Sequence, residues 1–311
     1  MNANVQKSSA GDRWGPWVYR SLLYMPVNEE RFLAKAHTRG ADAIILDLED
    51  SVALQEKAAA RKLLPAAAKR LADKGIDVVA RVNSPIRLCI PDLEEVVGPH
   101  VKGIWLPKCR SVDHVQMIAE TIAELEAERG MEVGSTWMAA RIETAQSFLR
   151  IGEISAAHPR VRAVGLGGED FSLSIGVEPS QDTLIYPKQQ AIIAAYAAGV
   201  APLGLVSSSA DFSDLDTMRQ VVRQSRRFGF IGASCIHPAV VPILNEGFRP
   251  TPDEVERAQR VSSAFYAAVK EGKASIQVDG KMVDYPVAYR ADRVLERDAL
   301  IRAKESKTGR G

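Results

Sequence analysis

The sequence predicts an α/β protein of the TIM (β/α)8 barrel class, followed by a C-terminal segment of helices and a hairpin. Short apolar runs alternate with amphipathic segments at a spacing of about 25 to 35 residues, the length of one β/α unit. Several runs are nearly continuous rather than alternating, which is typical of parallel strands covered on both faces. Glycines stand where the intervening helices should end, because a positive φ is favoured there. About eight such units predict a closed barrel.

The strand candidates share a short apolar core and lie at residues 18–25, 43–48, 78–82, 103–107, 137–142, 161–166, 202–206 and 230–236. The helix candidates lie between them at residues 29–39, 54–74, 112–129, 145–157, 187–198 and 214–227. Within the second helix we expect a break near Pro65, because proline cannot donate the helical hydrogen bond.

The pattern changes after the last strand. Thr251 precedes a proline and two acids, which is typical of a capped helix start, and an amphipathic run continues to Lys270. Residues 276–283 predict a hairpin turning at Asp279-Gly280, and a final helix is expected at 287–302. The expected organisation is a flexible N-terminus at 1–17, a catalytic barrel at 18–249, a lid or oligomerisation segment at 250–303 and a frayed tail at 304–311.

The composition is that of an ordinary globular protein, with 46% hydrophobic and 25% charged residues among 311. The net charge of +1 and the few aromatic residues argue against a nucleic-acid partner. Three distant cysteines without CxxC spacing indicate neither a disulfide framework nor a thiolate zinc site. No apolar run reaches the roughly 20 residues that a membrane helix needs, so we expect a cytoplasmic protein without a membrane partner.

Polar side chains follow six of the expected strands at their carboxyl ends, where TIM barrels place their reacting groups. They are Asp47-Leu48-Glu49-Asp50, Arg81-Val82-Asn83, Pro107-Lys108, Glu143, Glu169-Asp170 and His237-Pro238. Glu143 and Asp170 end consecutive β/α units and should point into one mouth. Two carboxylates there suggest Mg²⁺, which usually takes one or two protein carboxylates and fills its other positions with water and substrate oxygens. The sequence therefore predicts an enzyme.

Seven motifs in order along the chain carry a more specific resemblance. They are Arg20-Ser21-Leu22-Leu23-Tyr24-Met25-Pro26, Gly40-Ala41-Asp42 with Leu46-Asp47-Leu48-Glu49-Asp50-Ser51-Val52, Arg81-Val82-Asn83-Ser84, Leu106-Pro107-Lys108, Ile142-Glu143-Thr144, Gly168-Glu169-Asp170 and Ile236-His237-Pro238. Together they resemble the citrate lyase β-subunit-like branch of the HpcH/HpaI aldolase superfamily, which includes malyl-CoA and citramalyl-CoA lyases. The resemblance extends from about Arg20 to the helix after Tyr285.

The resemblance implies a Mg²⁺-dependent TIM barrel, with Mn²⁺ as an alternative ion, assembled as a homotrimer or hexamer. Its members cleave or form the carbon-carbon bond between a 2-oxo acid and an acyl thioester. Glu143 and Asp170 would then be the metal ligands, and Arg81 would bind carboxylate or carbonyl oxygens and stabilise the enolate. Glu49 and Asp50 would hold metal-bound waters.

Further roles follow from the same resemblance. Arg20, Arg81 and the element Gly168-Glu169-Asp170 would contact substrate. Met282-Val283-Asp284 aligns with an element that the family supplies from a neighbouring subunit, so Asp284 would be a general acid/base acting in trans. No Schiff-base lysine is required, so Lys108 is interpreted as a structural or CoA-proximal group.

The chain departs from the family pattern at two places. Gly232-Ala233-Ser234-Cys235 stands where many relatives have Gly-Lys before the Ile-His-Pro element, and Leu203-Gly204-Leu205 stands where relatives often have Ile-Asp. Both changes remove charge. The pocket near strands seven and eight is therefore expected to differ, and with it the specificity for the acyl group or the oxo acid.

The main functional hypothesis is an oxo-acid lyase that takes a short 3-hydroxyacyl-CoA thioester, such as malyl-CoA or citramalyl-CoA, to acetyl-CoA and a 2-oxo acid, or the reverse. One alternative is the citrate lyase β subunit, whose thioester is carried on an acyl-carrier protein. Another is a thioesterase or a Claisen-type synthase that uses the same site. The last alternative is a binding subunit without catalytic activity.

Overall fold

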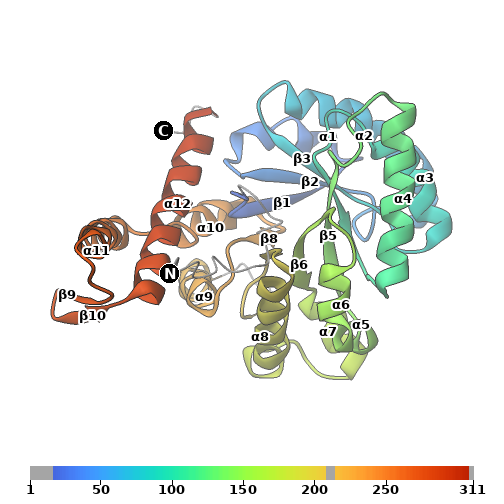
Figure 1. Ribbon diagram of the computed structural model, residues 1–311. Coiled ribbons are helices and arrows are strands. Elements are labelled where there is room, and N and C mark those ends of the chain that lie inside the picture. The colour runs from blue at the N-terminus through green and yellow to red at the C-terminus, as the bar shows by residue number, and fades with distance from the viewer. Residues whose placement is uncertain (1–16, 208–213, 308–311) are drawn as a thin grey trace. The chain divides into compact units, whose positions relative to one another are not determined.

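Residues 17–207 and 214–307 are described by the computed structural model of this chain. The chain divides into two compact units, Met1–Phe248 and Arg249–Gly311. No helix within the described ranges is long and apolar enough to cross a membrane. The first unit holds the candidate site at the strand ends, and the helices and strands of both units are labelled in Figure 1.

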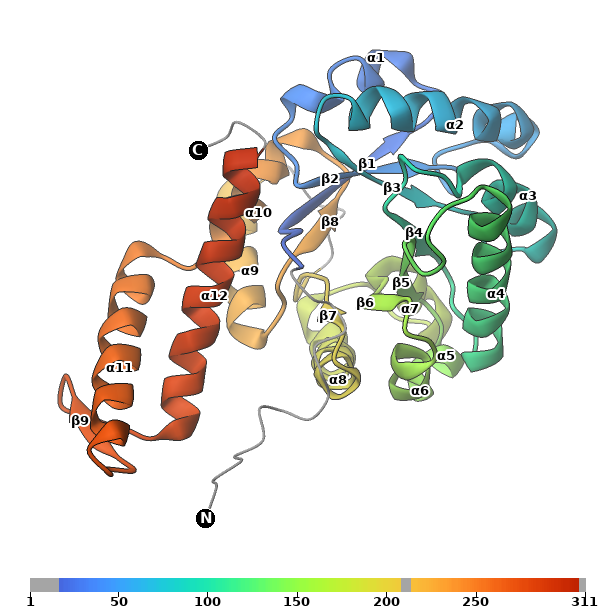
Figure 2. The ribbon, with the colours of Figure 1, turned by 45° about the horizontal axis from the view of Figure 1, so that its top comes forward.

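The first unit is a parallel barrel of eight strands in the order β7-β6-β5-β4-β3-β2-β1-β8. The strands are β1 (Ser21–Pro26), β2 (Ala43–Asp47), β3 (Asp77–Arg81), β4 (Gly103–Leu106), β5 (Trp137–Ile142), β6 (Val161–Leu166), β7 (Ala201–Pro202) and β8 (Ala233–Cys235). A parallel bridge between Leu203 and Gly232 joins the two ends of this order, where the Gly204 N–H donates to the Gly232 carbonyl at 2.9 Å. The predicted TIM barrel is confirmed (Figure 2).

The helices of this unit are α1 (Glu30–Leu33), η1 (Ala36–Thr38), η2 (Leu54–Glu56), α2 (Lys57–Ala72), α3 (Ile86–Val96), α4 (Val112–Glu128), α5 (Ala145–Leu149), α6 (Ile151–Ala156), α7 (Gly168–Ile175), α8 (Gln181–Ala198), α9 (Leu215–Phe228), η3 (Pro238–Val240) and α10 (Val241–Gly247). The sequence reasoning missed α3, α7 and α10. Of these, α7 matters most, because it begins at the candidate site.

Two expectations about prolines were wrong. The break near Pro65 does not occur, because α2 continues through this position. Pro65 is exposed, so water can satisfy the carbonyl that its missing N–H leaves free, while Leu64 and Leu71 hold the helix on the core. Helix α8 begins at Gln181 rather than at Pro187, because Ser180 and Thr183 form a capping box that starts the helix earlier.

Alternation along the strands separates two apolar layers. One set of side chains fills the barrel interior, and it includes Leu22, Ile45, Val79, Trp105 and Trp137. The other set packs the strands against the surrounding helices, which is the two-layer arrangement expected of a closed parallel sheet. The packed interior fixes the strand ends, so the side chains that follow them have a rigid support.

The second unit consists of α11 (Pro252–Lys270), β9 (Ile276–Val278), β10 (Lys281–Val283) and α12 (Tyr285–Lys307). The hairpin turns at Asp279 and Gly280, which have φ of 51° and 74°, as a two-residue primed turn requires. Phe265 is fully buried in an apolar cluster of this unit. Helix α12 extends beyond its expected end to Lys307. Residues 1–16 and 308–311, where most of the expected flexible terminus and part of the expected frayed tail fall, lie outside the described residues.

Candidate active site

Charged side chains from β2, β3 and the turn after β4 gather at the carboxyl ends of the strands. Arg81 lies at their centre and donates to Asp47 through two parallel hydrogen bonds, from Nε and Nη2, each of 2.7 Å. Its Nη1 lies 2.9 Å from a Glu49 carboxylate oxygen and 3.5 Å from Asp50. The guanidinium also stacks 4.7 Å from the centre of the Tyr24 ring. The protein's own carboxylates therefore occupy the Arg81 fork.

The pKa shifts of this pair agree with its geometry. Burial alone would raise the pKa of Asp47, but the Arg81 guanidinium and hydrogen bonds from Ser51 and the Glu49 N–H lower it. Burial alone would lower the pKa of Arg81, but its hydrogen bonds to Asp47 and the nearby carboxylates raise it. Both groups are thus held in their charged forms.

Lys108 connects this cluster to β5. Its backbone N–H donates to Glu143 at 2.8 Å and its ammonium donates to Glu49 at 2.9 Å. Lys108 has a φ of 47°, in the left-handed region that is uncommon for a residue with a side chain. Such a conformation costs energy and persists where surrounding contacts fix it, and it is frequent at functional sites. Lys108 therefore positions two carboxylates at once.

Glu49 and Asp50 differ in their exposure. Glu49 is 5% exposed. The pKa of Glu49 is raised to about 7, mainly by burial and also by Asp50, while Arg81 and Lys108 oppose the shift. The Asp50 side chain is 58% exposed and lies 3.6 Å from the Lys108 ammonium. One carboxylate of this pair is fixed inside the cluster, and the other faces the solvent.

Glu143 and Asp170 lie beyond this cluster. Glu143 is 7% exposed, and burial raises its pKa, with a further increase from nearby Asp170, against the lowering effect of Arg141 and Lys108. An added Cβ at Gly167 would lie 2.6 Å from a Glu143 carboxylate oxygen, so glycine is required there. Gly167 is the N-cap of α7, which carries Asp170 in its first turn.

These two carboxylates fit a magnesium ion. A buried carboxylate whose charge is disfavoured by burial and by a second carboxylate gains from a divalent cation between them. Mg²⁺ needs only one or two protein carboxylates. Within residues 17–207 and 214–307, no cluster of three or more His, Cys, Asp or Glu side chains could hold a metal by itself. Water or substrate oxygens would therefore supply the remaining ligands.

The structure does not bring Arg20 to these residues. Arg20 directly precedes β1, at the amino ends of the strands and thus at the opposite end of the barrel from the carboxylates. Its Nε donates to Asp42 at 2.8 Å and its Nη2 donates to the same carboxylate at 3.0 Å. Arg20 is 2% exposed. The guanidinium therefore joins the segments before β1 and β2 as a buried ion pair. This position does not support the predicted contact of Arg20 with substrate.

Asp284 lies in the second unit, between β10 and α12. A carboxylate oxygen of Asp284 accepts from the Val287 N–H at 3.3 Å, and its carbonyl accepts from the Ala288 N–H at 2.9 Å. This is the geometry of a helix N-cap. The side chain is half-buried. Asp284 therefore has a local structural role in addition to any chemical one.

Two cations near the site were missed by the sequence reasoning. Arg141 precedes Ile142 on β5, and Ile142 packs between sheet and helices, so alternation places Arg141 on the interior face. This signal was available in the sequence. Lys188 comes from the middle of α8 and is 4% exposed. Nothing in the local sequence distinguishes it from a solvent-facing lysine.

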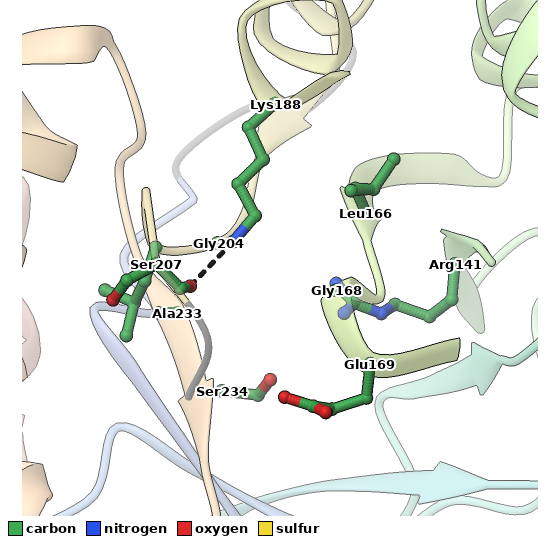
Figure 3. Close-up of a pocket in the computed structure, with 10 residues that line it drawn as sticks. Arg141, Leu166, Gly168, Glu169, Lys188, Gly204, Ser207, Ala233 and Ser234 are labelled. Atoms are coloured by element: carbon green, nitrogen blue, oxygen red, sulfur yellow. Dashed lines mark hydrogen bonds between the residues drawn. The ribbon is translucent and has the colours of Figure 1, made fainter. Parts of the chain in front are cut away.

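Arg141 and Lys188 line a cavity of about 40 Å³ beside the α7 start, together with Leu166, Gly168, Glu169, Gly204, Leu205, Ser207, Ala233 and Ser234. Figure 3 shows Arg141 and Glu169 extending into it from one side and Lys188 from another. The Lys188 ammonium donates to the Ser207 carbonyl at 2.6 Å. The pKa of Lys188 is lowered to about 7, mainly by burial and also by Arg141, while Glu169 opposes the shift.

A closed parallel barrel with buried carboxylates and cations at its strand ends is the arrangement found in TIM-barrel enzymes. The chain belongs to the HpcH/HpaI aldolase/citrate lyase family, whose pattern matches residues 20–238. It is a carbon-carbon lyase of the oxo-acid type. The resemblance seen in the sequence is thereby confirmed.

Individual relatives span nearly the whole chain. The citrate lyase beta subunit of Haemophilus influenzae is 33% identical over 282 residues, which are 89% of this chain and 96% of that protein. A (3S)-malyl-CoA thioesterase of Cereibacter sphaeroides is 35% identical over 270 residues, which are 86% of this chain and 90% of that protein. Among solved structures, protein CitE from Mycobacterium tuberculosis in complex with magnesium, acetoacetate and coenzyme A has a TM-score of 0.71 and 28% identity, and the match covers 91% of this chain and 99% of that one.

Proposed function

We propose that the protein is a Mg²⁺-dependent lyase for short 3-hydroxyacyl-CoA thioesters of the malyl-CoA or citramalyl-CoA type. The reaction gives acetyl-CoA and a 2-oxo acid, or runs in reverse. The observation that carries this proposal is the pair Glu143 and Asp170, brought together by β5 and the first turn of α7 beside the Arg81 cluster. The bound magnesium and coenzyme A of the similar Mycobacterium tuberculosis protein support it.

In this proposal Glu143 and Asp170 hold the ion, and Glu49 and Asp50 hold its water ligands. Mn²⁺ accepts the same oxygen donors and would occupy the same position. When bound, the ion supplies Lewis acidity to the oxygen of the oxo acid. Lys108 keeps Glu49 and Glu143 in place through its two hydrogen bonds.

The residues of the chain then have separate tasks. In cleavage, a base removes the proton of the 3-hydroxyl group, and the C2–C3 bond of the thioester breaks to give the carbonyl of the oxo acid. The electron pair of that bond forms the thioester enolate, which Arg81 stabilises, and a proton returned to its carbon gives acetyl-CoA. Backbone N–H groups at Gly168, Glu169 and Asp170 open α7 and suit the carboxylate of the oxo acid.

Asp284 is our candidate for the acid/base, contributed by the second unit of a neighbouring subunit in a trimer or hexamer. Large apolar side chains on α5, α7 and α8 are exposed and support an assembly: Leu149 by 84%, Leu173 by 80%, Tyr186 by 61% and Ile193 by 61%. Isolated exposed apolar residues are ordinary, but a group on neighbouring helices indicates an interface. The second unit would then act as a lid that closes when subunits assemble.

A mixing experiment tests the role of Asp284. Asp284→Asn keeps a good N-cap but cannot exchange a proton, so its loss of activity would report chemistry rather than folding. We expect inactive Asp284→Asn subunits, mixed with inactive Glu143→Gln subunits under exchange, to regain activity through hybrid oligomers. If the two variants are prepared with different masses, oligomers of intermediate mass confirm that subunits have exchanged. Exchange without recovered activity would restrict Asp284 to its own chain or to capping.

Two neighbouring activities are alternatives because relatives carry those names. A citrate lyase β subunit would require the thioester on an acyl-carrier protein. A thioesterase would release free thiol and a hydroxy acid without any oxo acid. A panel of hydroxyacyl-CoA thioesters, assayed for both the oxo acid and the free thiol, separates the three.

The same turnover assay tests whether the activity depends on Mg²⁺. We expect the turnover of the purified protein to stop in excess chelator and to return with Mg²⁺. Asp170→Asn should lose both turnover and Mg²⁺ binding, whereas Glu120→Gln, at an exposed position on α4, should retain both. Full turnover in chelator would exclude the metal-dependent lyase.

A further inference from the structure

Lys57 is the first residue of α2, and its side chain contacts the turn that follows β2. Its ammonium donates to the Leu48 carbonyl at 2.8 Å and to the Glu49 carbonyl at 2.7 Å. These two carbonyls belong to the peptide groups on either side of the Glu49 Cα atom. Because peptide groups are planar, holding both oxygens fixes the backbone at Glu49 and therefore the direction of its side chain.

The same turn is also held from the segment after β3 and from α3. The Asn83 side-chain amide donates to the Leu48 carbonyl at 3.0 Å and to Asp92 at 2.6 Å. Asp92 is fully buried on α3 and also accepts from Arg61 Nε at 2.9 Å. Arg61 lies one turn after Lys57 on α2, so both cations are on one face of this helix. That face is joined to the β2 turn directly through Lys57 and indirectly through α3.

The backbone of the turn does not need Lys57 to satisfy its hydrogen bonds. The Leu48 carbonyl also accepts from Asn83, and the Glu49 carbonyl also accepts from the Val52 N–H at 3.1 Å. A cation at the first position of a helix is unfavourable, because the amino end of the helix dipole is positive. Burial lowers the pKa of Lys57, while nearby carboxylates oppose the shift. A residue that opposes the local preference in this way is expected at a functional site.

The turn carries two carboxylates of the candidate active site. The Glu49 carboxylate lies 2.9 Å from Arg81 Nη1 and 2.9 Å from the Lys108 ammonium, but neither contact holds its backbone. Asp50 is held more loosely, since its side chain is 58% exposed and lies 3.5 Å from Arg81 and 3.6 Å from Lys108. The direction of Asp50 therefore depends mainly on the backbone that Lys57 fixes.

We propose that Lys57 is a positioning residue, which holds the β2 turn so that Glu49 and Asp50 meet the water ligands of the metal ion. The inference rests on the proposed Mg²⁺-dependent lyase function. Lys57 acts through Glu49 and Asp50 rather than on the substrate, because its ammonium donates to the carbonyls of the turn. Loss of an outer contact of a metal site typically weakens metal binding and activity by tenfold or more.

Three variants test this role. Lys57→Met keeps the apolar part of the side chain without the ammonium, and Lys57→Arg keeps several N–H donors. Lys62→Met is the matched control, at an exposed position of the same helix. We expect Lys57→Met to weaken Mg²⁺ binding, measured by calorimetry, and to lower kcat by about tenfold each, while the KM for the thioester changes less than about twofold. Lys57→Arg should stay within about threefold of wild type in both quantities.

Amide hydrogen exchange measures the turn without any substrate. In Lys57→Met we expect the N–H groups of Glu49 and Val52, which donate within the turn, to exchange about tenfold faster than in wild type, while β2 keeps its protection. The unfolding temperature should change by less than about 4 °C, because each carbonyl of the turn keeps another donor.

The outcomes separate the role of Lys57 from the lyase function. If no thioester is turned over, but exchange and Mg²⁺ binding change as expected, the lyase function fails and the role of Lys57 at the metal site stands. If Lys57→Met equals Lys62→Met in exchange, Mg²⁺ binding and kcat, the positioning role is overturned. Faster exchange in all strands with a large fall in unfolding temperature would also overturn it, since Lys57 would then stabilise the whole barrel. Wild type without Mg²⁺ binding would overturn both proposals.

Discussion

The two cationic regions at the mouth of the barrel are built in opposite ways. Arg81 is surrounded by acceptors, with Asp47 on its fork and Glu49 2.9 Å away. Arg141 has a single carboxylate, Glu143, at 3.9 Å, and Lys188 donates to a carbonyl with Glu169 on the opposite wall of the cavity, so that burial lowers the pKa of Lys188 to about 7. A cation with several close acceptors is already stabilised before substrate arrives, whereas one with few and distant acceptors gains more from an incoming anion. The Arg81 cluster therefore supports the site, whereas Arg141 and Lys188 are better suited to bind an anion.

The largest effect on stability should come from removing the counter-charge of Arg81. Asp47→Asn removes the counter-charge from a buried guanidinium, because Asp47 is 1% exposed and accepts both bonds of the fork. We expect a loss of about 3–5 kcal/mol in the free energy of unfolding, the cost of leaving a buried charge without its partner. Urea denaturation of wild type, Asp47→Asn and the exposed control Glu120→Gln measures it.

An Asp47→Asn variant as stable as wild type would contradict the comparison, because it would mean that Glu49 and Asp50 alone compensate Arg81. In that case Arg81 would have more freedom to bind substrate than its hydrogen bonds indicate. The turnover of the same variant then becomes informative, since a freed guanidinium could still stabilise the enolate.

Arg81→Lys tests the geometry of the same cluster while keeping its charge. A lysine ammonium cannot form the two parallel bonds to Asp47, and it would place a point charge where the fork now lies. We expect turnover to fall by about tenfold to a hundredfold, corresponding to the loss of one charge-assisted hydrogen bond in the transition state. Steady-state kinetics with protein of confirmed folding measures it, and an unchanged kcat would make Arg81 a purely structural residue.

Much of the barrel was predictable because its strands are continuous apolar runs. The bounds of β5 and β6 agree with the expected residues 137–142 and 161–166. Strands β7 and β8 are shorter than expected, because Pro202 and the positive φ of Gly204 interrupt regular pairing where the barrel closes. Helix α7 was not predicted, because the glycines at its start are poor helix formers.

The site was predictable where it depends on strand ends and less so where distant segments meet. Asp47 and Arg81 end strands, and Glu49 and Glu143 follow strand ends closely, so barrel geometry alone brings all four to one mouth. The pairing of Arg81 with Asp47 depends on side-chain directions that a linear pattern does not contain. Lys188 reaches the site from helix α8, and it lines the cavity together with Gly168 of α7 and Ala233 of β8. A helical pattern cannot reveal such a contact.

The pH dependence of stability in Lys188→Met tests the environment of Lys188 most directly. Burial lowers the pKa of Lys188 to about 7 in the folded protein, whereas an unfolded lysine titrates near 10.4. Between these values the unfolded chain binds one more proton than the folded one, so the free energy of unfolding rises with pH, by up to about 1.4 kcal/mol per pH unit. Below about pH 7 both states are protonated and this contribution is constant.

Methionine fills similar volume without a charge, so Lys188→Met should lack that rise. We expect wild type to gain about 2–3 kcal/mol relative to the variant between pH 7 and pH 9. Other titrating groups are common to both proteins and cancel in the difference. Urea denaturation at each pH provides the measurement, with the exposed Lys102→Met as the control that should follow wild type. Parallel curves for wild type and Lys188→Met would show that Lys188 has a counter-charge after all. Its buried charge would then be compensated like that of Arg81, and the two regions would differ in geometry alone.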